Sequence, residues 1–160
     1  MATVFVILFM LLFMFVYWGW PSEEKRVRNV LSEAAEAVED EDLLELSNIF
    51  TDDFTDDSGI TREDWELIVR TGFKVYDDIE IRVSAVEIDI AEDQATITFN
   101  ASAQGTYVPS LFKGGMPQVD QGSAANVALL LEKRDGDWVV IKAERLPLHF
   151  IPNEAMELLR

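Results

Sequence analysis

The alternation of apolar and polar positions between Asp78 and Tyr107 predicts two long strands around a short turn. Ile79, Ile81 and Val83 alternate with polar residues, and the apolar positions then change parity at Val86, Ile88 and Ile90. A period of two is typical of a strand with one buried face. A change of parity would turn the apolar set to the other face, so we expect a β-bulge near Ser84–Ala85 that bends the strand. A bent strand gives the sheet a concave side, where we expect any functional site.

The second strand of this hairpin has a clear division between its two faces. We expect its buried face to carry Ala95, Ile97, Phe99, Ala101 and Ala103, and its exposed face to carry Thr96, Thr98, Asn100, Ser102 and Gln104. An irregular loop is expected from Tyr107 to Gly122, and a third strand from Ser123 to Arg134. Asp135-Gly136 is typical of a hairpin turn into a fourth strand that ends near Leu146.

Three helices are predicted before the sheet. Residues 22–40 carry an apolar stripe at helical spacing, with Ser22 as N-cap. A shorter helix is expected from Glu41 to Ser47 or Ile49, and residues 49–60 are expected to form a polar loop. Thr61 and Asp64 are typical of a capping box at the start of the third helix. We expect Trp65 and Phe73 of this helix to be buried against Ile97 and Phe99, and a short helix at 153–159.

The segment Ala2–Trp20 contains no charged side chain and predicts a transmembrane anchor. A helix of this length reaches about 28 Å, close to the hydrocarbon thickness of a bilayer. A cleaved signal peptide is the alternative, but it would require basic residues before the apolar run and small residues at a cleavage site. We therefore divide the chain into an anchor (1–21) and a domain (22–160). Basic residues directly after the span favour a cytoplasmic over a periplasmic domain: Lys25, Arg26 and Arg28.

The net charge of −17 and the absence of cysteine limit the chemistry of the domain. An acidic domain repels nucleic acid, so no nucleic-acid partner is expected. Disulfides and cysteine-ligated metals are excluded. The acidic residues of 52–57 do not match the spacing of a calcium loop, and His149 is the only histidine, so we expect no metal. No phosphate-binding loop or nucleophile elbow is present, so we expect no cofactor.

The order of these elements resembles the nuclear transport factor 2-like superfamily, which is also called SnoaL-like and has a cystatin-like fold. The matching features are Phe50–Asp57 followed by Gly59, the helix start at Thr61–Asp64, and the closing strand Gly136–Val140. The resemblance implies an α+β cone, with three N-terminal helices packed on a curved antiparallel sheet of about four strands. With the anchor at Ala2–Trp20, we expect a single-pass protein of the bacterial inner membrane. Members include isomerases, dehydratases and cyclases as well as non-enzymes, so the fold does not determine the function.

The resemblance and the sequence together give a few candidate residues. An acid near the cone mouth could act as general base, and we name Asp53 and Asp57, with Tyr76 as a further catalytic candidate. Capping and turn formation with solvated carboxylates is the structural alternative for these acids. The small residues Ala101 and Ala103 could leave room for a ligand, with Tyr107 near the rim. The alternative, which the sequence favours, is that the first helix packs directly on these alanines.

Two functions remain open at this point. The first is a membrane-anchored, non-catalytic accessory domain that binds a protein partner or a small apolar ligand. The alternative is a small-molecule isomerase, dehydratase or cyclase that uses a carboxylate at the cone mouth; an Asp buried beside a Tyr in a pocket of a few hundred Å³ would favour it. A homodimer or partner interface is expected on the uncharged row Thr96, Thr98, Asn100 and Ser102.

Overall fold

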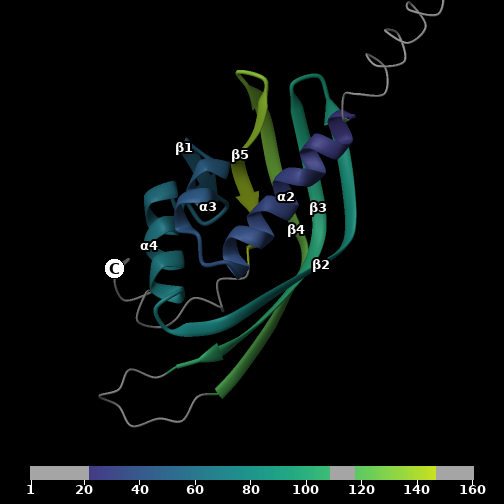
Figure 1. Cartoon of the computed structure of the whole chain (residues 1–160). Coiled ribbons are helices and arrows are strands. Elements are labelled where there is room, and N and C mark those ends of the chain that lie inside the picture. Colours follow the sequence, from purple (N-terminus) through teal and green to yellow (C-terminus); the bar gives the residue numbers. More distant parts are fainter. Residues whose placement is uncertain (1–21, 109–117, 147–160) are drawn as a thin grey trace, which may run out of the picture.

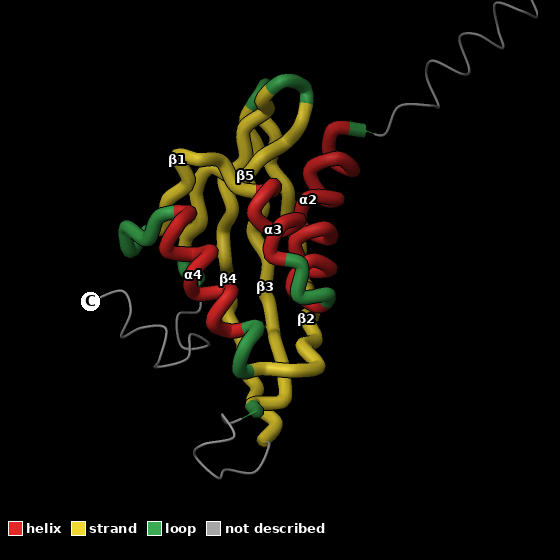
Figure 2. The backbone as a smooth tube through the Cα atoms, turned by 60° about the vertical axis from the view of Figure 1, so that its left-hand side comes forward, coloured by secondary structure: helices red, strands yellow, loops and turns green. Residues whose placement is uncertain are grey.

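The protein forms an α+β cone in which three helices cover one face of a strongly bent sheet (Figures 1 and 2). The computed structural model describes residues 22–108 and 118–146. In these residues the sheet has five strands in the order β1-β5-β4-β3-β2. The helices are α2 (Glu23–Glu39), α3 (Leu43–Ile49) and α4 (Arg62–Gly72). The strands are β1 (Phe50–Asp56), β2 (Tyr76–Ala91), β3 (Gln94–Tyr107), β4 (Gln118–Arg134) and β5 (Asp137–Glu144).

The predicted starts of the first and third helices are confirmed by their caps, whereas α3 begins at Leu43, later than the expected Glu41. The Ser22 hydroxyl accepts a hydrogen bond from the Lys25 backbone N–H at 3.3 Å. The Asp42 carboxylate caps α3 by accepting from the Glu45 N–H at 2.9 Å. Thr61 and Asp64 form the predicted capping box at α4. These contacts satisfy backbone N–H groups that have no partner within the helix.

The prediction of a polar loop over 49–60 is wrong in its first half, because Phe50–Asp56 forms strand β1. This strand pairs in parallel with β5, and the register shifts between Phe50 and Thr55. The shift breaks the alternation of buried and exposed positions: Thr51, Phe54 and Asp56 are buried, while Asp52 and Asp53 are exposed. A strand without regular alternation has no period-two signal in the sequence. β1 also accounts for the difference between five strands and the expected four.

The predicted bulge in β2 is confirmed. The pairing of β2 with β3 shifts between Ser84 and Glu87, and Ala85 has a φ of 51°. A further shift lies between Asp77 and Glu80, and Asn126 marks one in β4 with a φ of 55°. Each bulge bends the sheet, and together they curl β2, β3 and β4 toward the helices (Figure 1). β4 begins before the predicted Ser123, since Gln118–Gly122 pair with β3 instead of forming a loop.

The core lies between α2, α3 and the concave face of the sheet. Ile97 and Phe99 are buried as predicted, at 0% and 7% exposed. Trp65 and Phe73 are only half-buried, which corrects the prediction that they pack fully against the sheet. Both line a cavity between α4 and the sheet. The prediction is wrong for them because the sequence pattern identifies an inward face but not whether that face is filled.

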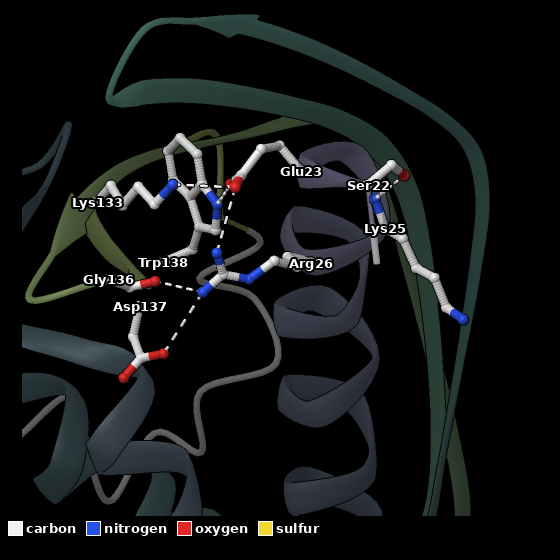
Figure 3. A network of polar contacts seen from close by, with 8 residues as sticks. All are labelled: Ser22, Glu23, Lys25, Arg26, Lys133, Gly136, Asp137 and Trp138. Atoms are coloured by element: carbon white, nitrogen blue, oxygen red, sulfur yellow. Dashed lines mark hydrogen bonds and ion pairs between the residues drawn. The ribbon is translucent and has the colours of Figure 1, made fainter. Parts of the chain in front are cut away.

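The first turn of α2 is attached to the β4–β5 hairpin by a network of polar contacts (Figure 3). The Glu23 carboxylate accepts from Trp138 Nε1 at 2.7 Å and from Lys133 Nζ at 3.0 Å. These hydrogen bonds hold the pKa of Glu23 below its ordinary value, and the bond from Lys133 has the larger effect. Arg26 adds an ion pair to Glu23 and donates to the Gly136 carbonyl. At its other end, α2 is held by Glu39, which accepts from the Ile81 N–H at 2.7 Å.

Several sequence predictions lie outside the described residues. They concern the anchor 1–21, most of the loop after Tyr107, His149 and the helix at 153–159. No helix within residues 22–108 and 118–146 has the length and hydropathy needed to cross a bilayer. The anchor, its orientation and the division of the chain at residue 21 therefore stay predictions.

Candidate functional site

A cavity of about 340 Å³ lies between the helices and the concave face of the sheet. Almost all of its lining is apolar. The helices contribute Leu31, Ala34, Val38, Leu43, Leu46, Trp65, Ile68, Val69 and Phe73, and the sheet contributes Ile79, Ile81, Val83, Phe99, Ala101, Ala103 and Leu129. The volume falls within the range of small-molecule sites, which are mostly apolar with a few polar groups. The position of the cavity confirms that the concave side is the hollow side of the domain.

A tyrosine–aspartate pair forms one polar part of the lining. The Tyr76 hydroxyl, at the start of β2, donates to Asp120 Oδ2 of β4 at 2.9 Å. The other carboxylate oxygen of Asp120 accepts from the Gln121 N–H at 3.0 Å. The Tyr107 ring packs edge-on against the Tyr76 ring, with 5.6 Å between centroids. Asp120 is exposed and Tyr76 is half-buried, so the pair lies where the apolar lining meets solvent.

An arginine held between two carboxylates forms the second polar part. Arg62, in the first turn of α4, donates through Nε to Glu66 at 3.1 Å and through a terminal nitrogen to Asp52 of β1. Arg62 and Glu66 both line the cavity and are half-buried. Because two carboxylates already neutralise this cation, it offers little positive charge to a ligand.

Two neutral polar side chains lie deeper in the lining. Trp65 Nε1 is fully buried and has no hydrogen-bond acceptor in the described part of the chain. Ser47 of α3 is 9% exposed. Leu43, Leu46 and Ser47 all line the cavity, and their spacing of i, i+3 and i+4 places them on one face of α3. Ser47 is not among the predicted site residues, although its place beside the apolar residues of α3 is a usable signal in the sequence.

The structure brings some predicted site residues together and separates others. Ala101 and Ala103 line the cavity, as does Tyr76. Tyr107 does not line it directly but contacts Tyr76. Asp120 was missed, because Gln118–Gly122 were assigned to a loop on the strength of the prolines and glycines around them.

Asp53 and Asp57 lie outside the cavity lining and take part in structural contacts. Both oxygens of Asp53 accept from Arg134, at 3.1 and 3.2 Å. The Arg134 hydrogen bonds lower the pKa of Asp53 to about 2, the opposite of what a general base requires. Asp57 accepts from the Arg145 N–H at 3.2 Å. The geometry therefore favours turn and ion-pair roles for these two acids over catalysis.

In the row proposed as an interface, Thr96, Thr98 and Asn100 alternate with buried residues of β3 and lie on the convex face of the sheet. Ser102 instead lines the cavity. Thr96 is exposed, while Thr98, Asn100 and Ser102 are half-buried. Asn100 accepts from the Asn126 N–H at 2.9 Å, which supports the bulge in β4. Within the residues that the structure describes, no group of three or more His, Cys, Asp or Glu side chains is arranged to hold a metal ion.

Comparison with known proteins identifies the fold. No protein-family model and no curated protein matches the sequence. Solved structures do match, among them a protein from Novosphingobium aromaticivorans described as a candidate scytalone dehydratase, with 17% identity and a TM-score of 0.63 over 76% of this chain and 81% of that one. The chain has a cystatin-like, nuclear transport factor 2-like fold.

Two further structures support this assignment. A hexachlorocyclohexane dehydrochlorinase (LinA, type 2) matches with 17% identity and a TM-score of 0.61, covering 77% of this chain and 83% of its own. A protein of unknown function with a cystatin-like fold from Nostoc punctiforme matches with 15% identity and a TM-score of 0.58, over 76% and 88% of the two chains. Identities this low establish the fold alone.

Proposed function

We propose that this domain binds a small, mostly apolar molecule in the cone and acts on it by proton transfer at the Tyr76–Asp120 pair. The observation that carries the proposal is the position of this pair in the lining of an apolar cavity of about 340 Å³. An Asp buried beside a Tyr in a pocket of a few hundred Å³ would favour an enzyme. The Tyr76–Asp120 pair meets this condition in part, because the two residues and the cavity are present but Asp120 is exposed. The neighbours described as a dehydratase and a dehydrochlorinase also favour the enzyme over a non-catalytic accessory domain.

The pair suits isomerisation of a carbon acid. In this reaction the Asp120 carboxylate takes a proton from a carbon beside a carbonyl, and the electrons of that C–H bond pass into an enolate. The carboxylic acid then returns the proton to the same or a conjugated carbon, so no external oxidant, reductant or cofactor is consumed. The hydrogen bonds from Tyr76 and from the Gln121 N–H fix the orientation of the carboxylate.

Binding without turnover is the second candidate. It is favoured by the apolar set on the inward face of β3 and by the lack of histidine, the commonest general base, in residues 22–108 and 118–146. In this case Tyr76 and Asp120 would only hold a polar group of the ligand at the cavity mouth.

Hydrogen exchange at carbon distinguishes the two candidates. With the ketone 2-tetralone in deuterated buffer, NMR should show loss of its α-protons at a rate that increases with the concentration of full-length protein. Asp120→Asn should remove most of this increase, because the amide is not a base. Asp135→Asn, in the β4–β5 turn, removes a carboxylate of similar exposure and should have no effect. Calorimetric binding of 2-tetralone without accelerated exchange would support binding alone, and no binding would contradict both candidates.

A further inference from the structure

Ser47 stands out because its hydroxyl is accessible from the cavity and makes no hydrogen bond within the described part of the chain. It is nine-tenths buried and lines the cavity. Among residues 22–108 and 118–146 the structure contains no hydrogen bond to or from this hydroxyl. A serine inside a helix commonly donates to the carbonyl four residues earlier, as Ser32 does to Arg28 at 3.4 Å. Ser47 makes no such bond to Leu43.

The Ser47 hydroxyl can form a hydrogen bond with a molecule in the cavity, because none of its donor or acceptor capacity is used within the described part of the chain. The hydroxyl lies on the face of α3 that carries Leu43 and Leu46 toward the cavity. A molecule inside the cavity is therefore the partner that this position can reach.

The charges around the cavity limit what that molecule can be. The charged residues in its lining are Arg62, Glu66 and Asp120, and Arg62 is already paired with Glu66 and Asp52. The whole chain carries a net charge of −17. An anionic ligand would lose its hydration in an apolar cavity and meet carboxylates at the polar parts of the wall. The lining is thus unfavourable to carboxylates and phosphates.

We propose that Ser47 binds the polar group of the ligand, and that the ligand is an uncharged apolar molecule bearing a hydroxyl or carbonyl oxygen. This inference rests on the proposed binding in the cone and adds the class of ligand and the residue that selects it. Ser47 supplies one donor and two acceptor sites, so it can pair with either kind of oxygen. The apolar wall contributes binding free energy, and Ser47 orients the molecule within it.

The test uses three probes of nearly the same shape: 2-naphthol, naphthalene and 2-naphthoate. Binding of each to the full-length protein is measured by isothermal titration calorimetry. We expect 2-naphthol to bind more tightly than naphthalene, and 2-naphthoate to bind at least about tenfold more weakly than 2-naphthol. Ser47→Ala should weaken 2-naphthol about 3- to 10-fold, the range of one hydrogen bond, and leave naphthalene unchanged. The matched control is Ser32→Ala, at an exposed serine of α2, which should change neither.

The outcomes separate this inference from the function on which it rests. If naphthalene and 2-naphthol bind equally and Ser47→Ala affects both alike, Ser47 does not select the ligand and the inference is overturned. Tight binding of 2-naphthoate would overturn the exclusion of anions. If none of the three probes binds, the proposed binding in the cone fails as well. Ser47→Ala should fold, because it removes no hydrogen bond of the described part of the chain. The comparison of the three probes on the unsubstituted protein also tests the inference without any variant.

Discussion

At the scale of single residues, similar acids have different roles because their partners differ. Asp53 and Asp120 are both exposed carboxylates on strands. Asp53 accepts from the guanidinium of Arg134, which lowers its pKa, whereas Asp120 accepts a hydrogen bond from the Tyr76 hydroxyl. The sequence shows the acids but not the partners, because Arg134 is 81 positions from Asp53 and Tyr76 is 44 from Asp120. The acids were therefore predictable from the sequence as a class, but the hydrogen-bond partner of each acid was not.

The Asp53–Arg134 pair gives a prediction about pH. The pKa of Asp53 falls from 3.8 in its ordinary state to about 2 in the folded protein, chiefly through the Arg134 hydrogen bonds. A lowered folded pKa gives stability that is complete above the ordinary pKa and is lost as the pH falls through the folded value. We expect Asp53→Asn to unfold at lower urea than the unsubstituted protein at neutral pH, with a difference that shrinks between about pH 4 and about pH 2.

The control for this prediction is the same substitution in an Arg134→Met background. There the ion pair is already absent, so Asp53→Asn should produce a difference in urea midpoint that does not vary over this pH range. The effect is expected to be small, because Asp53 is exposed and water screens the pair. The prediction would be contradicted if, with Arg134 in place, the difference in urea midpoint caused by Asp53→Asn stayed constant down to about pH 2.

At the scale of elements, local signals predicted the helices and the central hairpin, while non-local pairing determined the rest. Ser22 and Thr61 cap their helices through contacts three residues away. β1 instead exists through its pairing with β5, in which Phe50 faces Val140. The early part of β4 likewise depends on pairing with β3, as at Gly122 with Ala103. No short window of sequence contains such a partner, which explains why both strands were assigned to loops.

The capping box of α4 gives a prediction about stability. Thr61→Ala removes the side chain that accepts from the Asp64 N–H and donates to its carboxylate. The free energy of unfolding should fall by about 1 kcal/mol, within a range of about 0.5–2 kcal/mol for N-cap substitutions. Thr61→Ser keeps the hydroxyl and should retain most of the stability. Urea denaturation measures both; equal losses for the two variants would show that the methyl group matters and the cap does not.

At the scale of the whole molecule, the two faces of the bent sheet differ in what covers them. The three helices cover the concave face of the sheet (Figure 2). The cavity lies between these helices and the sheet. The convex face of the described sheet is not covered by any of its helices. Paired residues on neighbouring antiparallel strands lie on the same face, so Thr96 lies beside Leu130, and Thr98 beside Ala128. The centre of this face is thus uncharged over two strands.

The strands on either side carry charges around this uncharged centre. On β2, Asp89 and Glu87 lie opposite Thr96 and Thr98, and on β5, Lys142 and Glu144 lie opposite Leu130 and Ala128. An uncharged centre with a polar rim is the usual anatomy of a protein interface. Lys142 also carries a sign opposite to that of the acids on β2, so a second copy turned by half a rotation could place unlike charges together at the rim.

We therefore predict that the domain self-associates through the convex face. Thr98→Lys places a charge in the uncharged centre, and it should lower the mass of residues 22–160 in sedimentation velocity while leaving the circular dichroism spectrum unchanged. Ser32→Lys adds the same charge on an exposed helix face and should leave the mass as it was. We expect the uncharged centre to contribute most of the binding free energy, and the exposed charges of the rim to contribute little. Added salt should therefore weaken the association less than Thr98→Lys does. A monomeric mass for the unsubstituted domain at high protein concentration would mean that the uncharged rows are an ordinary strand surface, where threonine is common whatever lies opposite.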